Sequence, residues 1–522
     1  METAELGERE LNAASQMIEE KPQGGPAIKQ ASKANQSAEV KEIIKTFRIV
    51  DGVAPVDEFV THRENKRVCV KFGKTYSKVL NQASVSDNTN KFYILQMLED
   101  IHTNDIFVFF RWGRIGVRGQ DSLIPFGKNI GAAIAEFDTK FNDKAVEGNY
   151  EELDIVYGDE VSPEEQEQAL LESLKNCKVT HKVGELITFI FSLKMMHTQI
   201  QEIGFDAKKT PLGKLSNANV KTGYTILKNI LKEIEGGATD WKQKVAGFSN
   251  KFFTFIPHDF GFKDMAKQIL DTKEKVQTKL EFLESVSNMK IAQSVIDQDK
   301  DSGIITVDKY YKGLKNDIKE LDPQSDEFKT IEKYLKSCIG GGIDIVFDVH
   351  DIYTLNREGE DEKFKKDIGN RKLLWHGSKM SNFASILSQG LKLPPAEAPN
   401  SAYKYGKGVY FTDSASKAAL YCHAKNSGGT GLILLADVAL GTPRVLKKPD
   451  PEAANLPAGH HSVLIPGKHS PEEKNSAAHE HGFSIPMGPL RHNADGVLSH
   501  NLYAVYNTDQ IRGRYLCKCR FV

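Results

Sequence analysis

The sequence predicts a multidomain α+β protein, and three observations lead to that prediction. With 522 residues, the chain is too long for one hydrophobic core, because single cores stop growing beyond roughly 250–300 residues. Apolar and polar residues alternate between about 62 and 128, whereas apolar residues recur at helical spacing between about 163 and 297. From about 304 onwards, short apolar runs punctuated by Gly and Pro indicate a mixed α+β domain.

Composition excludes several classes of protein. The net charge of -1 excludes a wholly basic nucleic-acid binder, although a local basic face is compatible with it. No apolar run approaches the roughly 18–20 residues that span a bilayer, and the N-terminus METAELGERELNAAS is too polar for a signal peptide. We therefore expect an intracellular protein with no membrane partner. The six cysteines are scattered, which predicts reduced thiols and no zinc, and Cys517 and Cys519 fit alternation along a terminal strand.

Residues 1–60 are predicted to form a disordered tail. They are rich in Glu, Lys, Ala, Gln and Ser, and such a segment cannot bury enough apolar surface to offset its ordering entropy. Up to residue 48 the tail has seven Lys/Arg against eight Asp/Glu, so it lacks the basic character of a DNA-binding tail.

Residues 61–160 are predicted to form a small domain with a mixed β-sheet. The segments RVCVKFGKTYSKVLNQ, KFYILQMLED and IFVFFRWGRIGVRGQ look like strands, and NIGAAIAEFDTKFNDK looks like a helix. Between residues 63 and 128 there are eleven Lys/Arg against six Asp/Glu, a local balance that suits phosphates.

The tripeptide Trp112-Gly113-Arg114 alone indicates only a strand-end turn with one core Trp. Together with KFYILQMLE before it, GQDSLIPFG after it and Asn149-Tyr150 at the end, it resembles the WGR domain of the poly(ADP-ribose) polymerases. The resemblance implies binding to DNA strand breaks, with Trp112 on the exposed sugar and Arg114 on the DNA side or at an interdomain contact. Phosphate contacts position a protein without reading sequence, which fits recognition of a break.

Residues 175–300 are predicted to form an all-α bundle, preceded by a linker helix that opens at 163–165. The segment 184–203 is apolar nearly all round, so we expect one long buried helix there. Further helices are expected at 220–234, 240–256 and 273–296. The segments 211–216 and 256–261 resemble the helical regulatory domain of the same family, and His258 within the second segment is expected to be structural.

Residues 304–522 contain the most specific signal. Arg371 to Trp375 look like a short buried strand that ends at His376-Gly377-Ser378. A lone His beside a Trp is more often a core residue than a catalytic one. The continuation SNFASILSQGLKLPP, then YGKGVYF at 405–411 and YC at 421–422, resembles the NAD-binding signature of the poly(ADP-ribose) polymerases, and so implies a mixed α/β ADP-ribosyltransferase domain.

ADP-ribosyl transfer breaks the bond between nicotinamide and ribose through a transition state with oxocarbenium character. Gly377 suits contact with the carboxamide, because the absence of a β-carbon lets backbone groups approach. Tyr410 and Tyr421 suit stacking on the nicotinamide ring. The resemblance implies that His376 and Tyr410 are catalytic, that NAD is a substrate, and that no metal is needed. The NAD-binding residues it implies are His376, Gly377, Ser378, Ser385, Lys392, Tyr410 and Tyr421.

Three positions depart from the family pattern. Leu502 stands where the catalytic Glu belongs, Ala418 replaces a Ser that bonds the carboxamide, and Ser385 replaces a Gly. Loss of a charged group placed for the transition state costs a few kcal/mol, or roughly two to three orders of magnitude in rate. His500, two residues before Leu502, could share its strand face and substitute for the Glu, or an accessory protein could supply the acid.

The resemblance therefore implies a nuclear, DNA-break-stimulated ADP-ribosyltransferase of the DNA damage response, of the short DNA-dependent type. Its acceptors would be proteins, including itself, and Leu502 favours transfer of single units. The alternative is a catalytically silent module that binds DNA ends or senses NAD. Five histidines at 460–481 fit no strong metal-ligand spacing, so we expect a solvated loop there.

Overall fold

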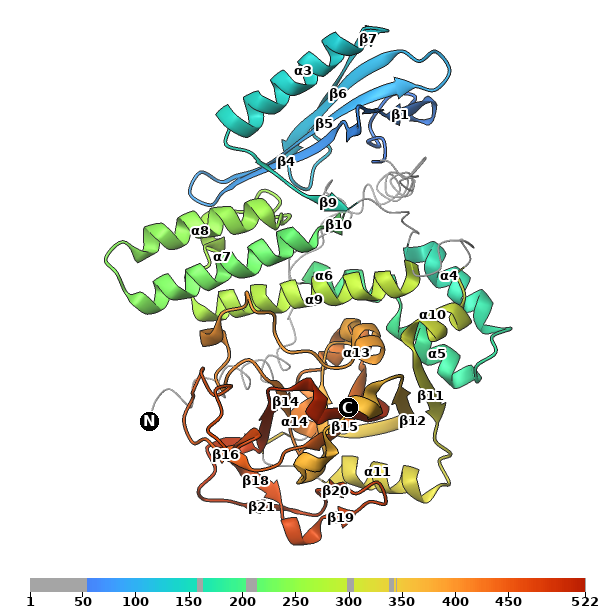
Figure 1. Cartoon of the computed structure of the whole chain (residues 1–522), viewed down its shortest axis with the longest axis vertical. Coiled ribbons are helices and arrows are strands. Elements are labelled where there is room, and N and C mark those ends of the chain that lie inside the picture. The colour runs from blue at the N-terminus through green and yellow to red at the C-terminus, as the bar shows by residue number, and fades with distance from the viewer. Residues whose placement is uncertain are drawn as a thin grey trace, which may run out of the picture. The chain divides into compact units, whose positions relative to one another are not determined.

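The computed structural model of the protein describes residues 54–156, 163–202, 214–297, 305–337, 342–343 and 345–521 (Figure 1). The multidomain α+β prediction is confirmed: a strand-rich region is followed by a helical region and then by a mixed region. Residues 1–53 of the predicted tail lie outside the described residues. Ala54 and Val60 are buried against the first sheet, so the predicted end of the tail at residue 60 falls too late. None of the described helices is both long and apolar enough to cross a membrane.

The first region, which resembles a WGR domain, is built on one antiparallel sheet. The strands run in the order β7-β6-β5-β4-β8, with β1 also paired to β5. Helix α3 (Ile130–Asn142) packs Ala133 and Phe137 onto one face of the sheet, and the Asn129 side chain caps it by accepting from the Ala132 N–H. The strands are β1 Lys66–Val68, β2 Val70–Lys71, β3 Lys74–Thr75, β4 Ser77–Ser84, β5 Thr89–Asp100, β6 Ile106–Arg114, β7 Gln120–Gly127 and β8 Glu151–Glu152.

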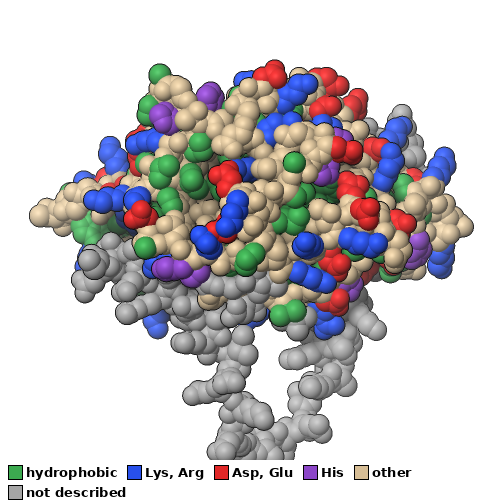
Figure 2. Space-filling model, turned by 90° about the horizontal axis from the view of Figure 1, so that it is seen from below, with side chains coloured by type: hydrophobic (Ala, Val, Ile, Leu, Met, Phe, Trp, Pro, Cys, Tyr) green, Lys and Arg blue, Asp and Glu red, His purple; other side chains and the backbone are tan. Residues whose placement is uncertain are grey.

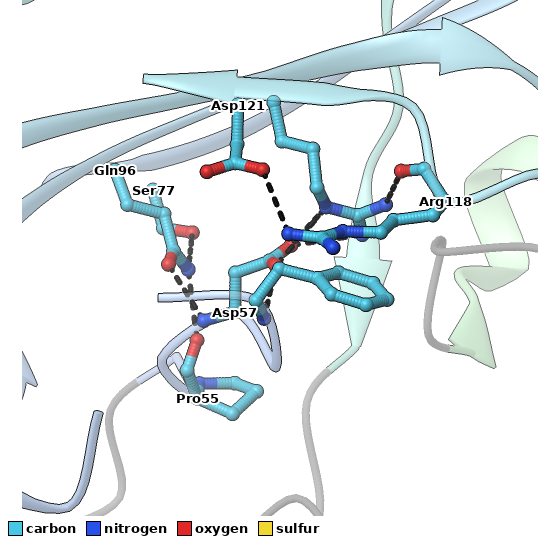
Figure 3. Close-up of polar contacts among 8 residues, drawn as sticks. Pro55, Asp57, Ser77, Gln96, Arg118 and Asp121 are labelled. Carbon is cyan, nitrogen blue, oxygen red and sulfur yellow. Dashed lines mark hydrogen bonds and ion pairs between the residues drawn. The ribbon is translucent and has the colours of Figure 1, made fainter. Parts of the chain in front are cut away.

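A buried ion pair fixes the segment that precedes this sheet. Arg111 donates through Nε to both carboxylate oxygens of Asp57 at 3.0 Å, and its guanidinium lies 4.7 Å from the centroid of the Phe59 ring. Gln96 accepts from the backbone N–H of Asp57 and donates to the carbonyl of Pro55, as Figure 3 shows. Asp57 and Arg111 are both buried, so each charge is compensated by the other. The chain is thus tied to the sheet before β1 begins.

The helical region departs from the prediction at one point. The predicted single helix over 184–203 is wrong: the structure has α5 (His181–Ile190) and α6 (Leu193–Glu202), with a break at Phe191. The buried side chain of Gln166, from α4 (Pro163–Leu174), satisfies both sides of the break. Its Nε2 donates to the Phe191 carbonyl at 2.7 Å and its Oε1 accepts from the Leu193 N–H at 3.2 Å. A distant polar residue therefore replaces the helical hydrogen bonds.

Three longer helices lie side by side in Figure 1 and pack around one apolar core. Ser216 caps α7 by accepting from the Asn219 N–H, and Gly237 ends it with a φ of 61°, a conformation that glycine adopts without strain. The helices are α7 Asn217–Gly236, α8 Trp241–Phe255 and α9 Lys273–Asp297, and the short strands β9 Ile155–Val156 and β10 Lys214–Leu215 pair beside them.

The C-terminal region combines three sheets. The main sheet has the order β11-β12-β24-β15-β13-β20-β19, a second has β14-β23-β17-β16, and a third has β21-β18-β22. Cys517 and Cys519 both point into the buried cluster under β24, as alternation predicts. The main-sheet strands are β11 Asn316–Glu320, β12 Phe347–Arg357, β13 Arg371–Gly377, β15 Thr430–Ala439, β19 Ala477–Ala478, β20 Ser484–Ile485 and β24 Ile511–Phe521. The others are β14 Val409–Phe411, β16 Pro443–Val445, β17 Ser462–Ile465, β18 Gly467–Pro471, β21 Leu490–His492, β22 Leu498–His500 and β23 Leu502–Val505.

Short helices cover this region, and there are more of them than the sequence predicted. They are α10 Val307–Leu314, α11 Asp326–Ser337, α12 Glu360–Lys363, α13 Phe383–Gln389 and α14 Ala415–Ala419. The predicted loop at 460–481 is also wrong in part, because β17, β18 and β19 cross it. His469 lies on β18, and the ring of His479 stacks on Phe483 with the centroids 4.3 Å apart. On the face seen in Figure 2, acidic and basic side chains are interspersed, in keeping with the near-zero net charge.

Candidate active site

Strand β13 ends at Gly377, where the chain comes into close contact with α14. Residues 371–377 pair with β15 along their whole length, and Trp375 forms a bridge to Thr412 on the other side. A β-carbon on Gly377 would fall 1.8 Å from the carbonyl oxygen of Ala418. Only glycine therefore fits at this position. The strand thus brings the Gly377 backbone against Ala418 of α14, whose carbonyl also accepts from the Tyr421 N–H.

The geometry around His376 fixes its tautomer. Its Nδ1 lies 2.9 Å from the backbone carbonyl oxygen of Tyr410. Because a carbonyl oxygen can only accept, Nδ1 must bear the hydrogen. Burial lowers the pKa of His376, and the hydrogen bond to Tyr410 only partly offsets that effect. The ring is therefore neutral at pH 7, and its Nε2 has a lone pair that can accept from a hydroxyl group.

Tyr410 and Tyr421 lie on different elements. Tyr410 is the central residue of β14, paired with Ala504 of β23, and its hydroxyl donates to the Gly406 carbonyl. Tyr421 follows α14 and leaves 51% of its surface accessible. Burial of the phenol raises the pKa of Tyr421, and the nearby Glu281 carboxylate raises it further.

Leu502 begins β23, opposite Ile465 of β17. Its side chain packs, as does that of Tyr410, against an apolar cluster that includes Val463, Ile465 and Ala504. The position where the family pattern has an acid is thus occupied by an apolar residue in apolar surroundings. Ala418, the second departure, is buried beside Gly377 and offers only its backbone carbonyl there.

The expectation that His500 shares the strand face of Leu502 is wrong. His500 is the last residue of β22 and Leu502 the first of β23, and these strands belong to different sheets. The His500 side chain is fully buried, with its ring centroid 6.1 Å from that of His469. The chain turns at Asn501 between the two strands. A buried imidazole in the third sheet is not placed to replace an acid at position 502.

Asn501 and Tyr503, the neighbours of Leu502, are held by one buried carboxylate. Asp413 Oδ2 accepts from Asn501 Nδ2 at 2.6 Å and from the Tyr503 hydroxyl at 3.2 Å. Burial raises the pKa of Asp413 to about 6, and these two hydrogen bonds oppose the rise. The network ties the start of β23 to the residues that follow β14. The network fixes the backbone on both sides of Leu502, because Asn501 and Tyr503 are its neighbours along the chain and their side chains point to the opposite face of the strand.

The remaining predicted residues are placed by α13. The Ser378 hydroxyl accepts from Asn382 at 3.0 Å, Ser385 is buried within α13, and Lys392 lies exposed beyond the end of that helix, where it donates to Gln389. The structure therefore brings His376, Gly377 and Tyr410 together through the sheets, whereas Ser385 lies on a separate helix and Lys392 lies beyond the end of that helix.

Sequence reasoning missed a group of charges on α9. The Glu281 carboxylate lies 3.7 Å from Nζ of Lys379, the residue that directly follows Ser378. Glu284 follows one turn later on α9. Desolvation raises its pKa, and the nearby Lys379 opposes the rise. Only the tertiary packing of α9 against the 380–389 segment brings Glu281 to Lys379, and no local pattern indicated it.

In the first region, Trp112 and Arg114 have different environments. Trp112 is half-buried and stacks on Tyr93 with the ring centroids 6.0 Å apart. Arg114 donates to the carbonyl of Gly261 at 2.6 Å and to that of Asn88 at 2.7 Å. Gly261 belongs to the loop after α8. Of the two placements that the sequence left open for Arg114, the structure has the interdomain contact.

Three family models match the chain. The description "Poly(ADP-ribose) polymerase catalytic domain" matches residues 325–521, "Poly(ADP-ribose) polymerase, regulatory domain" matches 177–311, and "WGR domain" matches 76–155. The three matches follow one another in the same order as the three structural regions.

Similar proteins align along nearly the whole chain. A poly [ADP-ribose] polymerase 2 of Zea mays is 36% identical over 521 residues, which cover 95% of this chain and 79% of that protein. A poly [ADP-ribose] polymerase 2 of Homo sapiens is 36% identical over 529 residues, covering 96% and 88%. A poly [ADP-ribose] polymerase 1 of Gallus gallus is 34% identical over 522 residues, covering 95% and 50%.

Proposed function

The chain belongs to the poly(ADP-ribose) polymerase family and is an NAD+ ADP-ribosyltransferase, and we propose that DNA breaks stimulate it to transfer single ADP-ribose units to proteins. The observation that supports the catalytic part best is the arrangement of His376, Gly377 and Tyr410. A neutral imidazole whose Nε2 can accept, a strand end at which only glycine fits and a tyrosine paired within a sheet lie at adjoining strand positions.

Each residue has a proposed role. The backbone of Gly377 holds the carboxamide of the nicotinamide, and Tyr410 and Tyr421 enclose its ring. His376 accepts from a hydroxyl of the adenosine-side ribose through Nε2. Ser378, Ser385 and Lys392 extend the site toward the adenine, with Lys392 exposed beyond α13.

The limitation to single units is proposed from Leu502. An alkyl side chain cannot polarise the hydroxyl of a bound ADP-ribose, so chain elongation loses more than the first transfer. The competing proposal, a silent module that binds DNA ends or senses NAD, is favoured by the same residue and by Ala418.

DNA-break binding is proposed for the first region through Trp112 and its basic surroundings, with nuclear function in the DNA damage response. Arg114 supports coupling to the rest of the chain, because its contact with Gly261 joins the sheet to the loop that leads toward α9. The other proposed partners are acceptor proteins, including the chain itself. An accessory protein that supplies a carboxylate in trans is one way to compensate for the acid that is missing at Leu502.

The proposal is tested by incubating the purified full chain with labelled NAD, with and without a blunt 5′-phosphorylated duplex, and separating the products on a gel. We expect a sharp labelled band that depends on the duplex. A smear would refute the limitation to single units, and label that is independent of DNA would refute stimulation. Measurable binding of DNA and NAD without label would establish the silent alternative. The Trp112→Ala variant should lose the DNA dependence.

A further inference from the structure

The segment 410–414 joins the end of β13 to α14. The carbonyl of Tyr410 accepts from His376, and the backbone of Thr412 is hydrogen-bonded in both directions to that of β13, at 2.8 and 3.0 Å. Ser414 caps α14, because its hydroxyl accepts from a backbone N–H in the first turn of that helix. One short segment therefore holds the strand end and the helix of the candidate site together.

Asp413, between Thr412 and Ser414, extends this connection to the start of β23. It is only 2% exposed, and its Oδ2 accepts from Asn501 at 2.6 Å and from the Tyr503 hydroxyl at 3.2 Å. The other end of the Asn501 amide is also engaged, since Oδ1 accepts from a backbone N–H of β18 at 2.8 Å. The carboxylate thus holds both neighbours of residue 502.

The strand ladder alone does not reach this position. The last pair between β14 and β23 is Phe411 with Tyr503, and Leu502 pairs on its other side, with β17. Asp413 and Asn501 each lie two residues beyond that last pair, so their hydrogen bond continues the contact past the end of the ladder. Position 502 is therefore held from the β14 side by a side chain and not by strand pairing.

We propose that Asp413 is a positioning residue of the transferase, which holds Asn501 and Tyr503 so that the side chain of residue 502 faces the ribose of the nicotinamide. The side chain in that place is now Leu502, so the chain retains the geometry for an acid although the acid is absent. This inference rests on the proposed function, because it states how the site would present a carboxylate to NAD.

The position of residue 502 bears on the cleavage of NAD. The bond between C1 of the ribose and the nicotinamide nitrogen breaks, its electron pair leaves with the nicotinamide, which becomes neutral, and positive charge develops on the ribose. The oxygen of an acceptor then bonds to C1, and its proton, where it has one, passes to solvent. A carboxylate stabilises the positive charge only at short range, and a misplacement of about 1 Å costs on the order of a hundredfold.

The test is a double-mutant cycle on initial rates of nicotinamide release from NAD by the full chain, with the blunt duplex present. Leu502→Glu supplies the acid, and Asp413→Leu removes the acceptor of both hydrogen bonds at similar side-chain size. Each variant is also made alone. We expect Leu502→Glu to raise kcat by roughly a hundredfold with little change in the KM for NAD, and Asp413→Leu to reduce that gain by roughly tenfold or more.

Two further variants in the Leu502→Glu background distinguish positioning from a structural role. Asp413→Asn should keep the gain, because its amide oxygen can accept from both donors. Tyr503→Phe removes one hydroxyl and replaces Asp413→Leu in the cycle if the latter does not fold; we expect it to lower kcat by about fivefold or more. The matched control is Tyr515→Phe, since the Tyr515 hydroxyl donates to the Glu327 carboxylate at 2.6 Å from a different sheet, and it should leave kcat unchanged.

The outcomes separate this inference from the proposed function. If Asp413→Leu and Tyr503→Phe lower the Leu502→Glu rate by no more than they lower the wild-type rate, Asp413 does not position residue 502 and the inference is overturned. If wild type releases nicotinamide and Leu502→Glu is no faster, residue 502 does not face the ribose; the inference falls while the transferase function stands. If none of the proteins releases nicotinamide, the catalytic proposal fails together with it.

Discussion

Replacing Gly377 with Ala should weaken NAD binding about a hundredfold without unfolding the protein. The added methyl group would lie 1.8 Å from the carbonyl oxygen of Ala418 and 2.7 Å from its carbonyl carbon. Non-bonded carbon and oxygen atoms approach to about 3 Å at the closest, so β13 and α14 would have to separate by more than about 1 Å. Strand β13 is held by β15 on one side and by the Trp375–Thr412 bridge on the other, which leaves α14 as the element that moves.

That movement displaces Tyr421 with α14, since its backbone N–H donates to the Ala418 carbonyl at 3.1 Å. A displacement of about 1 Å in a group that positions a substrate costs on the order of a hundredfold. We therefore expect the dissociation constant for NAD, measured by isothermal titration calorimetry, to rise by about two orders of magnitude. The same movement overpacks the core in which Ala415, Ala418 and Ala419 are buried, so we expect the free energy of unfolding to fall by about 1–3 kcal/mol while the protein stays folded.

Gly247→Ala is the matched control for this substitution. Gly247 lies within α8, and nothing is found within 4 Å of the position that its β-carbon would occupy. Alanine favours a helix by about 1 kcal/mol over glycine, so this variant should be slightly more stable and bind NAD normally. If Gly377→Ala binds NAD as tightly as the control does, the Gly377 backbone does not form the floor of the nicotinamide site.

Two further predictions concern stability. Asp57→Ala leaves the Arg111 charge buried and unpaired, so we expect the free energy of unfolding of the first region to fall by about 3–5 kcal/mol. Asp121→Ala removes only the exposed pair with Arg118 and should lower it by at most about 1 kcal/mol. Equal losses for the two variants in chemical denaturation would contradict this account. Burial raises the pKa of Asp413 from 3.8 to about 6, so this group stabilises the fold least above pH 6. The free energy of unfolding of Asp413→Asn should therefore rise relative to that of wild type by up to about 3 kcal/mol as the pH increases from 4 to 6.5. A stability difference between the two proteins that does not depend on pH would refute the raised pKa of Asp413.

Local patterns predicted those parts of the fold that local interactions determine. The strand 371–377 has buried apolar residues at its centre, and glycine ends it where the backbone meets α14. Helices α7 and α8 follow the predicted apolar spacing closely, because each buries one face in the same core. Helix α9 was also predicted, but it divides its buried residues between two cores, with Leu283 in one and Val295 in the other. Cys517 and Cys519 likewise follow strand alternation.

The errors arose where a distant side chain decides the backbone path. The break at Phe191 depends on Gln166, which supplies both a donor and an acceptor from another helix. The turn between His500 and Leu502 depends on Asn501, whose amide donates to Asp413 and whose oxygen accepts from the Gly467 N–H. Neither break has a Gly or Pro at the position concerned, so no local signal contradicted a continuous element.

The candidate site likewise divides into residues that local motifs predict and contacts that only the tertiary fold creates. The residues of the strand ends, His376, Gly377 and Tyr410, could be predicted because their motifs are local. The tautomer of His376 could not, since it depends on the Tyr410 carbonyl that the fold brings to within 2.9 Å. The ion pair of Glu281 with Lys379 could not be predicted either, because the sequence of α9 gives no indication of which of its charges meet another region.

The charges near Ser378 and the residues around Leu502 bear on the stabilisation of a cationic transition state. Lys379 and Glu281 largely neutralise each other, 3.7 Å apart, and the apolar packing of Leu502 removes the charge that the family pattern has beside Tyr410. Because a cationic transition state is stabilised by a fixed negative charge nearby, the apolar side chain at position 502 should limit the rate of nicotinamide release.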